Sequence, residues 1–259
     1  MLLCTVRGCG RQLVRLDRHF ACSHGHNFDV ARSGYVNLLQ PGDSRSRRPG
    51  DTTQAVAARR RLHEKGVTRP LADAIADITR ASPQDKALDV GCGDGFYLGT
   101  LAQEIGFEAH GVDISIPAVD AAALRYRSCE WVVANADRFI PWSPGSFSIV
   151  MSVTARMNSG EFRRVLADDG RLLVAIPSPE DLIELRGPGR DRTERTKETF
   201  AKDFNLVEHR RTTTAADLEA AAVEDILVSV YRPMRSAPVT AMRVTFSLDL
   251  LLFQCRGSG

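Results

Sequence analysis

The feature that most constrains this chain is a run of alternating glycines, Asp89-Val-Gly-Cys-Gly-Asp-Gly95, which follows a short apolar segment. Glycine has no Cβ atom, so Gly91, Gly93 and Gly95 allow the backbone to turn sharply and to approach a ligand closely. The apolar segment KALDV before the run predicts a buried strand, and the residues after it predict a helix near 95–105. A glycine turn between a parallel strand and a helix is typical of a ligand-binding site.

Strand and helix patterns alternate from residue 86 onward. After the glycine turn we expect strands at AHGVDIS, CEWVVANAD, SFSIVMSV and GRLLVAIP, with helices near 116–127 and 159–167. This alternation predicts an α/β domain with a doubly wound, Rossmann-like parallel sheet. Two later segments, FNLVEHRRTTT and VTFSLDLLLFQCR, are rich in β-branched and aromatic residues and predict the strands that close the sheet.

The chain upstream of the sheet divides into two parts. Residues 1–39 contain short apolar pieces, turns, and a cluster of cysteines and histidines, which predicts a small separate module. Residues 40–69 form a basic linker, rich in Pro, Gly, Ser and Arg, and a helix at 53–65. A further helix at 70–80 opens the sheet domain, which we expect to span residues 70–259.

Positive charge is concentrated at the front of the chain. Residues 1–70 contain 13 Lys and Arg against 5 Asp and Glu, whereas the remainder contains 21 against 27. A basic segment with Arg45, Arg47 and Arg48 indicates a polyanionic partner, and guanidinium groups suit phosphate geometry. The alternative is a solvated loop that follows codon bias, because Arg outnumbers Lys 30 to 4.

Acidic residues around the glycine turn indicate which ligand it binds. Asp89 and Asp94 would repel a pyrophosphate, but they suit the ammonium and sulfonium groups of S-adenosylmethionine. Asp113 ends the next strand, where a carboxylate can accept hydrogen bonds from ribose hydroxyls. Asn135 and Asp137 end the third strand, where they can contact the adenine. Because these features occur in order, a cofactor site is favoured over a turn needed only for tight packing.

The N-terminal cysteines have the spacing of metal ligands. Cys4, Cys9 and Cys22 are followed by His24 and His26, and structural zinc takes four Cys and His ligands. Either histidine could supply the fourth ligand, and we favour His26. Bound zinc would stabilise a module that has few apolar residues. The alternative is that the cysteines are free and buried.

We expect neither a membrane span nor a secretory signal. The chain contains no apolar run of about 18 residues or more, the length that a transmembrane helix needs. The first residues, MLLCTVRGCGRQL, lack the apolar stretch and the small-residue cleavage site of a secretory signal. A cytoplasmic protein with no membrane partner is therefore expected.

Four motifs occur in the order of a known family: HNFDVARSGYVNLLQP, SRSRRPGDT, a helix with AARR, and LDVGCGDGFY. On these motifs the chain resembles the bacterial 23S rRNA (guanine-N1)-methyltransferases, whose members include ones that give resistance to tylosin-type macrolides. The resemblance extends from residue 4 to the region of residue 186. It implies a methyltransferase that acts in rRNA processing, a zinc ribbon that helps to bind RNA, and a homodimer.

The resemblance also implies site residues. The zinc ligands correspond to Cys4, Cys9, Cys22 and His26, and cofactor contacts correspond to Thr68, Gly93, Asp94 and Asp181. This chain departs from the family at three of these points. The spacing between the first two cysteines is wider, Thr68 replaces the common Tyr, and Asp181 replaces the common His. The segment MSVTARMNSGE also lacks the usual Ala-Pro-Cys.

Methyl transfer requires the nucleophile, methyl group and sulfur to be held in line. Guanine N1 carries a proton near neutral pH, so a base should assist, and Asp137, Asp181 and Glu184 are candidates. The sequence alone assigns no catalytic residue. Two other functions stay open, a methyltransferase for a small molecule and a non-catalytic RNA-binding protein that keeps the fold. The basic front end disfavours the first, and the intact glycine run with Asp113 disfavours the second.

Overall fold

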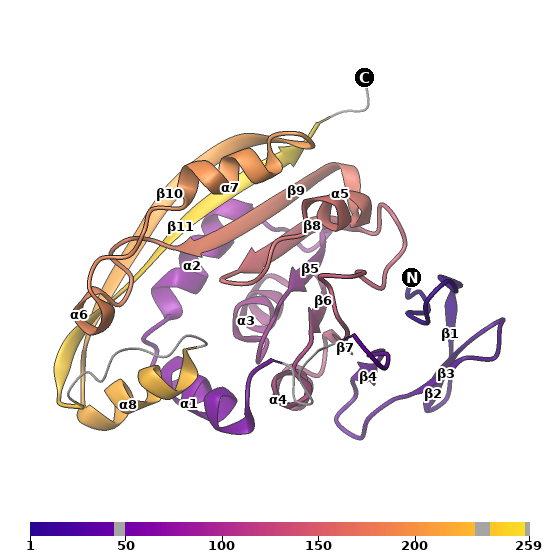
Figure 1. Cartoon of the computed structure of the whole chain (residues 1–259), viewed down its shortest axis with the longest axis horizontal. Helices are drawn as coiled ribbons and strands as arrows, with labels where there is room; N and C mark the ends of the chain where they lie inside the picture. Colours follow the sequence, from indigo (N-terminus) through magenta and orange to yellow (C-terminus); the bar gives the residue numbers. More distant parts are fainter. Residues whose placement is uncertain (44–49, 231–238, 257–259) are drawn as a thin grey trace.

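The computed structural model describes residues 1–43, 50–230 and 239–256. A large mixed sheet with helices on both faces forms the body, and a small antiparallel sheet lies at one end of the molecule (Figure 1). Arg45, Arg47 and Arg48 lie outside the described residues.

Within the described residues the large sheet has eight strands, in the order β10-β11-β9-β8-β5-β6-β7-β4. Their bounds are β4 Val36–Asn37, β5 Lys86–Val90, β6 Glu108–Asp113, β7 Glu130–Val133, β8 Phe147–Val153, β9 Leu166–Pro177, β10 Phe204–Leu218 and β11 Met242–Cys255. In the part of the sheet with the order β9-β8-β5-β6-β7-β4, each strand is parallel to its neighbours. Strand β11 runs antiparallel to both β9 and β10. This is the doubly wound sheet, closed by two late strands, that the sequence predicts.

Helices cover both faces because alternate residues of each strand point to opposite sides. Ala87 and Ile149 pack with the apolar side chains of α2, α3 and α4, whereas Leu88 and Val150 pack with those of α5 and α7. The helix bounds are α1 Thr53–Glu64, α2 Arg69–Thr79, α3 Phe96–Ile105, α4 Ile116–Arg125, α5 Ser159–Val165, α6 Ile183–Arg186, α7 Thr193–Phe200 and α8 Ala220–Ser229. No helix in the described part of the chain is long and apolar enough to cross a membrane.

Several elements differ from the sequence expectation, and the short helices α6 and α7 are among those not expected. The helix expected at 159–167 ends at Val165, because Leu166 adopts an extended backbone and pairs with Phe147 of β8. Helix α8 was not expected, and it packs against α1, as Figure 1 shows at the lower edge of the molecule. These two helices lie beside the glycine turn, so they matter for the site.

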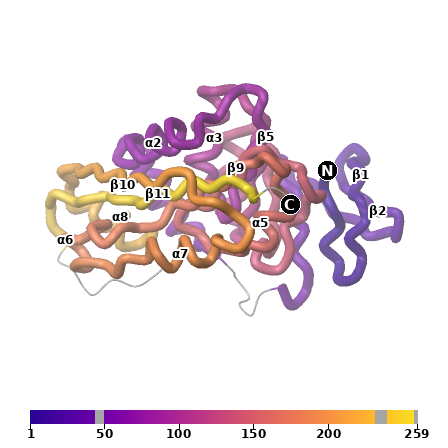
Figure 2. The backbone as a smooth tube through the Cα atoms, turned by 90° about the horizontal axis from the view of Figure 1, so that it is seen from above, coloured from indigo at the N-terminus to yellow at the C-terminus, as the bar shows by residue number. Residues whose placement is uncertain are grey.

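The small sheet contains β1 Leu13–Leu16, β2 His19–Cys22 and β3 Asn27–Asp29. It lies beyond the β4 end of the large sheet, and Figures 1 and 2 show it there from two directions. The sequence assigns residues 1–39 to this module, but Val36 is buried and pairs with β7 of the large sheet. A bridge between Leu2 and Trp142 adds a second connection. The boundary at residue 39 stays a prediction.

Candidate cofactor and metal sites

The glycine turn joins β5 to α3 and tolerates no side chain at two of its positions. Gly91 has a φ of +80°, and an added Cβ would lie 2.4 Å from the Cβ of Ala155. Gly95 has a φ of +74°, and an added Cβ would lie 2.5 Å from the ring of Trp131. Both the backbone conformation and the close approach therefore require glycine. The segment after β8, which contains Ala155, lies directly on this turn.

Three carboxyl groups surround the turn, and those of Asp89 and Asp94 are buried. Asp89 is 1% exposed, and its Oδ1 atom has no hydrogen-bond partner among the described residues. Burial raises the pKa of Asp89 to about 8, and the charge of Asp113 adds to this effect. Burial also raises the pKa values of Asp94 and Asp113. An unpaired buried carboxylate oxygen is costly, so this site fits a cationic hydrogen-bond donor such as the ammonium group of S-adenosylmethionine.

Asp113 at the end of β6 is fixed to the glycine turn. Its Oδ2 atom accepts a hydrogen bond from the Gly93 N–H at 3.0 Å, and its Oδ1 atom accepts one from the Ser115 N–H at 2.8 Å. An ionised carboxylate has about four lone-pair positions, so two remain for hydroxyl donors. The geometry is compatible with the predicted ribose contact.

Asn135 and Asp137 follow β7 as expected, but the Asn135 amide already has partners. Its Nδ2 atom donates to the Asp43 carbonyl at 2.6 Å, and its Oδ1 atom accepts from the Asp137 N–H at 3.0 Å. The Asp137 carboxylate is 46% exposed and lies 3.3 Å from Arg156. Asn135 therefore holds the chain just before residue 44, and an adenine contact from this pair stays a prediction.

His63, which the sequence analysis did not identify, links Thr68 to Asp94 in the glycine turn. The Thr68 hydroxyl lies 2.6 Å from Nδ1 of His63, and Nε2 of His63 lies 3.7 Å from Oδ1 of Asp94. The imidazole stacks on Phe96, with ring centroids 3.8 Å apart and planes 2° from parallel. Burial lowers the pKa of His63 to about 3, and the charge of Arg59 adds to this effect, so the ring is neutral.

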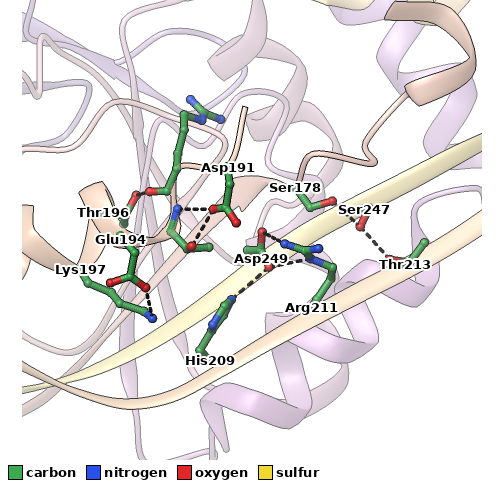
Figure 3. A network of polar contacts seen from close by, with 12 residues as sticks. Ser178, Asp191, Glu194, Thr196, Lys197, His209, Arg211, Thr213, Ser247 and Asp249 are labelled. Atoms are coloured by element: carbon green, nitrogen blue, oxygen red, sulfur yellow. Dashed lines mark hydrogen bonds and ion pairs between the residues drawn. The ribbon is translucent and has the colours of Figure 1, made fainter. Parts of the chain in front are cut away.

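Asp181 lies on the segment after β9 and is held by β11. Its Oδ1 atom accepts from the Ser247 N–H at 3.0 Å, and its Oδ2 atom accepts from Arg186 at 2.5 Å. The Ser247 hydroxyl lies between those of Ser178 and Thr213, at 2.7 Å from each, as the close view in Figure 3 shows. Burial raises the pKa of Asp181.

Tyr97 is the second residue of α3, and its ring meets that of His63 edge-on, with centroids 6.1 Å apart. Burial raises the pKa of Tyr97, and the charges of Asp181 and Asp94 add to this effect. Glu184, the other acidic candidate on this segment, accepts from the N–H and the hydroxyl of Thr245 and is occupied by β11. The aromatic Tyr97 follows the turn directly, and its place in the first turn of the helix was the signal that could have identified it.

Arg59 on α1 is a third residue that the sequence analysis did not assign to this site. Its Nη1 atom donates to Asp51 at 2.6 Å, and its Nη2 atom donates to the Ser229 carbonyl at 2.8 Å. The guanidinium lies against the glycine turn, because a Cβ added to Gly93 would be 3.4 Å from Nη1. Burial would lower the pKa of Arg59, but the charge of Asp51 and its hydrogen bond outweigh this effect.

The small sheet and the loops beside it bring four potential metal ligands together. One ligand atom from each of Cys4, Cys9, Cys22 and His26 lies within 4.8 Å of the others. Nδ1 of His26 is 3.4 Å from the Cys4 sulfur and 3.3 Å from the Cys22 sulfur, and the sulfurs of Cys9 and Cys22 are 3.8 Å apart. Tetrahedral zinc with Zn–S near 2.3 Å requires edges of roughly 3.5–3.8 Å, so the set fits zinc. The His24 ring lies 3.6 Å from the Cys9 sulfur, and His24 does not belong to the four-ligand set.

Comparisons with known proteins identify two families in the chain. The methyltransferase domain family matches residues 87–174, and a zinc-ribbon family described as "RlmA, N-terminal" matches residues 4–47. Fold and sites together define an S-adenosylmethionine-dependent methyltransferase that carries an N-terminal zinc ribbon. The 23S rRNA (guanine(748)-N(1))-methyltransferase of Streptomyces fradiae is 36% identical over 230 residues, which cover 82% of this chain and 79% of that protein. The chain belongs to the family of 23S rRNA (guanine-N1)-methyltransferases.

Other comparisons extend this result. A relative from Micromonospora griseorubida, provisionally named a 23S rRNA (guanine-N1)-methyltransferase, is 33% identical over 71% of this chain and 68% of its own length. Among solved structures, the [4+2]-cyclase SpnF superposes with a TM-score of 0.51 at 16% identity, over 73% of this chain and 81% of that chain. At this identity the solved structure supports the fold alone.

Proposed function

We propose that this chain transfers the methyl group of S-adenosylmethionine to N1 of a guanine in 23S rRNA. The observation that carries this proposal is the similarity to a relative that is named for this reaction. The relative, from Streptomyces fradiae, is similar to 82% of this chain. The four-ligand cluster and the acidic glycine turn supply the zinc ribbon and the cofactor site that such an enzyme requires.

Bound S-adenosylmethionine supplies an electrophilic methyl group on a sulfonium. The residues of this chain hold the reacting groups in line, and such positioning accounts for much of the rate of a displacement. We assign the ammonium group to the unpaired Oδ1 atom of Asp89 and the ribose hydroxyls to Asp113. Gly91, Gly93 and Gly95 provide the close backbone approach, and Asp94 lies at the start of α3 beside them.

A base is needed for the proton on guanine N1. We assign this role to Asp181, whose side chain is 13% exposed and whose pKa is raised by burial. Its oxygens accept from the Ser247 N–H and from Arg186, so the assignment rests on the raised pKa. In Glu184, hydrogen bonds from Thr245 outweigh burial and lower the pKa, and Asp137 is half-exposed beside Arg156.

Three finer features rest on the resemblance alone. We propose that the enzyme works as a homodimer, that it acts in the cytoplasm, and that its methylation confers resistance to a macrolide. Sedimentation of the purified protein tests the first. The growth of susceptible cells with and without the gene, on tylosin, tests the last.

Primer extension on 23S rRNA from cells with and without the gene tests the proposed function in vivo. A methyl group on N1 blocks the base-pairing edge of guanine, so reverse transcription should stop one nucleotide before the target. The guanine that corresponds to position 748, named for the Streptomyces fradiae relative, is the first to examine. Identical stops in both strains across the entire 23S rRNA would reject the proposal.

A further inference from the structure

Negatively charged side chains outnumber positively charged ones in the set around the glycine turn that includes Arg59. Four carboxyl groups, those of Asp51, Asp89, Asp94 and Asp113, interact with one another or with Arg59. This acidic set suits the sulfonium and ammonium groups of the methyl donor, but it repels the donor's α-carboxylate. The α-carboxylate therefore needs a cation that lies among these acids.

Thr68 and Asp181, which the family resemblance assigns to cofactor contacts, do not supply this cation. The Thr68 hydroxyl is paired with His63, and the low pKa of His63 keeps that ring neutral. Asp181 carries an acidic group where the family commonly has a histidine. Arg125 also acts on Asp94, but its guanidinium pairs with Glu64 at 3.6 Å and lies over the ring of Tyr126.

Arg59 has the required charge, position and free donors. Its side chain is 27% exposed, so a ligand can reach it, and Nη1 lies against Gly93 in the middle of the turn. A guanidinium has five N–H donors, and the contacts with Asp51 and the Ser229 carbonyl use two of them. Those contacts join α1 to the end of α8 and fix the orientation of the fork before a ligand binds.

We propose that Arg59 binds the α-carboxylate of S-adenosylmethionine. An Arg–carboxylate pair is charge-assisted and commonly bidentate, and a pre-oriented fork loses little entropy on binding. Arg59 thereby replaces the polar contacts that Thr68 and Asp181 do not offer. The inference rests on the proposed function only in that S-adenosylmethionine is the donor.

A pair of ligands that differ only in the carboxylate tests this role. Decarboxylated S-adenosylmethionine keeps the adenosine, the sulfonium and the amine, and calorimetry gives the dissociation constants of both ligands. The wild-type protein should bind S-adenosylmethionine more tightly than the decarboxylated form. Arg59→Met should weaken S-adenosylmethionine about 10- to 100-fold, as expected when a charge-assisted hydrogen bond is lost, and change the affinity for the decarboxylated ligand less than about threefold.

Arg60→Met is the matched control, because Arg60 lies on the same helix but pairs with Glu64 on the exposed side. It should leave both dissociation constants unchanged. If Arg59→Met does not fold, Arg59→Lys keeps the charge without the fork and should show an intermediate preference for S-adenosylmethionine.

Two results would overturn the inference. Equal losses for both ligands in the Arg59 variants would show that Arg59 only supports the fold. A wild-type protein that binds both ligands equally well would show that no cation recognises the carboxylate. A wild-type protein that binds neither would instead reject S-adenosylmethionine as the donor, and with it the proposed function.

Discussion

Nδ1 of His63 lies 2.6 Å from the hydroxyl oxygen of Thr68, and both side chains are buried. This contact joins the last turn of α1 to the residue that precedes α2. A face of the same imidazole stacks on Phe96, the first residue of α3. One neutral ring therefore connects three helices directly behind the glycine turn.

Replacement of Thr68 tests this connection. Thr68→Val should lower the free energy of unfolding by about 1–3 kcal/mol, because it leaves a buried imidazole nitrogen without a partner. Thr68→Ser keeps the hydroxyl and should lower it by less. Denaturant unfolding of the apo protein measures both values, and equal losses in the two variants would show that the hydrogen bond contributes nothing.

The buried carboxyl group of Asp89 predicts a pH dependence of stability. Its pKa is about 8 in the folded chain and near ~3.9 when unfolded, so the folded state binds more protons between these values. The free energy of unfolding should therefore fall as pH rises through this range. His63 has the opposite effect, because its folded pKa of about 3 lies below its unfolded pKa near ~6.5, and its contribution is complete above pH ~6.5.

The range from pH ~6.5 to ~8 thus isolates Asp89 from His63. Wild-type apo protein should lose about 1–2 kcal/mol of stability between these pH values relative to Asp89→Asn. The variant should also bind S-adenosylmethionine more weakly, since the ammonium loses its charged partner. Parallel stability curves for the two proteins would mean that Asp89 is already ionised in the folded state.

The geometry of the zinc site predicts different metal contents for variants of the two candidate histidines, His24 and His26. His26→Ala should lose the metal, whereas His24→Ala should retain about one zinc per chain, because His26 belongs to the four-ligand set and His24 does not. Metal analysis of freshly purified, reduced protein measures the stoichiometry. A wild-type preparation with well under one zinc per chain would contradict the site itself.

The proposed base predicts a kinetic signature. Asp181→Asn should lower kcat about 100-fold or more and remove the rise in activity with pH that follows ionisation of the raised carboxyl group. Glu184→Gln, on the same segment but bound to Thr245, is the matched control and should keep the wild-type profile. An unaltered pH profile in Asp181→Asn would assign the residue to support of β11 through Ser247.

The Arg-rich segment predicts a salt dependence. Replacement of Arg45, Arg47 and Arg48 together by Ala should lower RNA affinity and leave cofactor binding intact. The slope of log K against log salt should shrink by about two to three units, near one for each lost phosphate contact. A wild-type slope in the triple variant would show that this segment does not contact the RNA.

The sequence predicted those parts of the site that are local in the chain. The glycines, Asp89 and Asp94 form one continuous motif, and Asp113 follows from the position where the next strand ends. Arg59 and His63 were missed because they precede the turn by some 30 residues, and only the packing of α1 against α8 and α3 brings them to it. A helical pattern predicts α1 but not the surface on which it docks.

The sequence predicts which residues lie at the ends of strands better than it predicts the hydrogen-bond partners of their side chains. Asn135 lies at the end of β7 as predicted, yet its amide supports the Asp43 carbonyl. Val36 was expected in the small module, but two strand residues were too short a pattern to predict its pairing with β7. In both cases a tertiary partner far away in the sequence decides the outcome.

The most direct test of the account is the modified nucleoside itself. Purified protein is incubated with unmodified 23S rRNA and methyl-labelled S-adenosylmethionine, and the RNA is digested to nucleosides and separated. We predict that the label appears in 1-methylguanosine, and that Asp89→Asn lowers its yield. Label in another nucleoside, or none in a protein that binds both zinc and S-adenosylmethionine, would contradict guanine-N1 methylation of 23S rRNA.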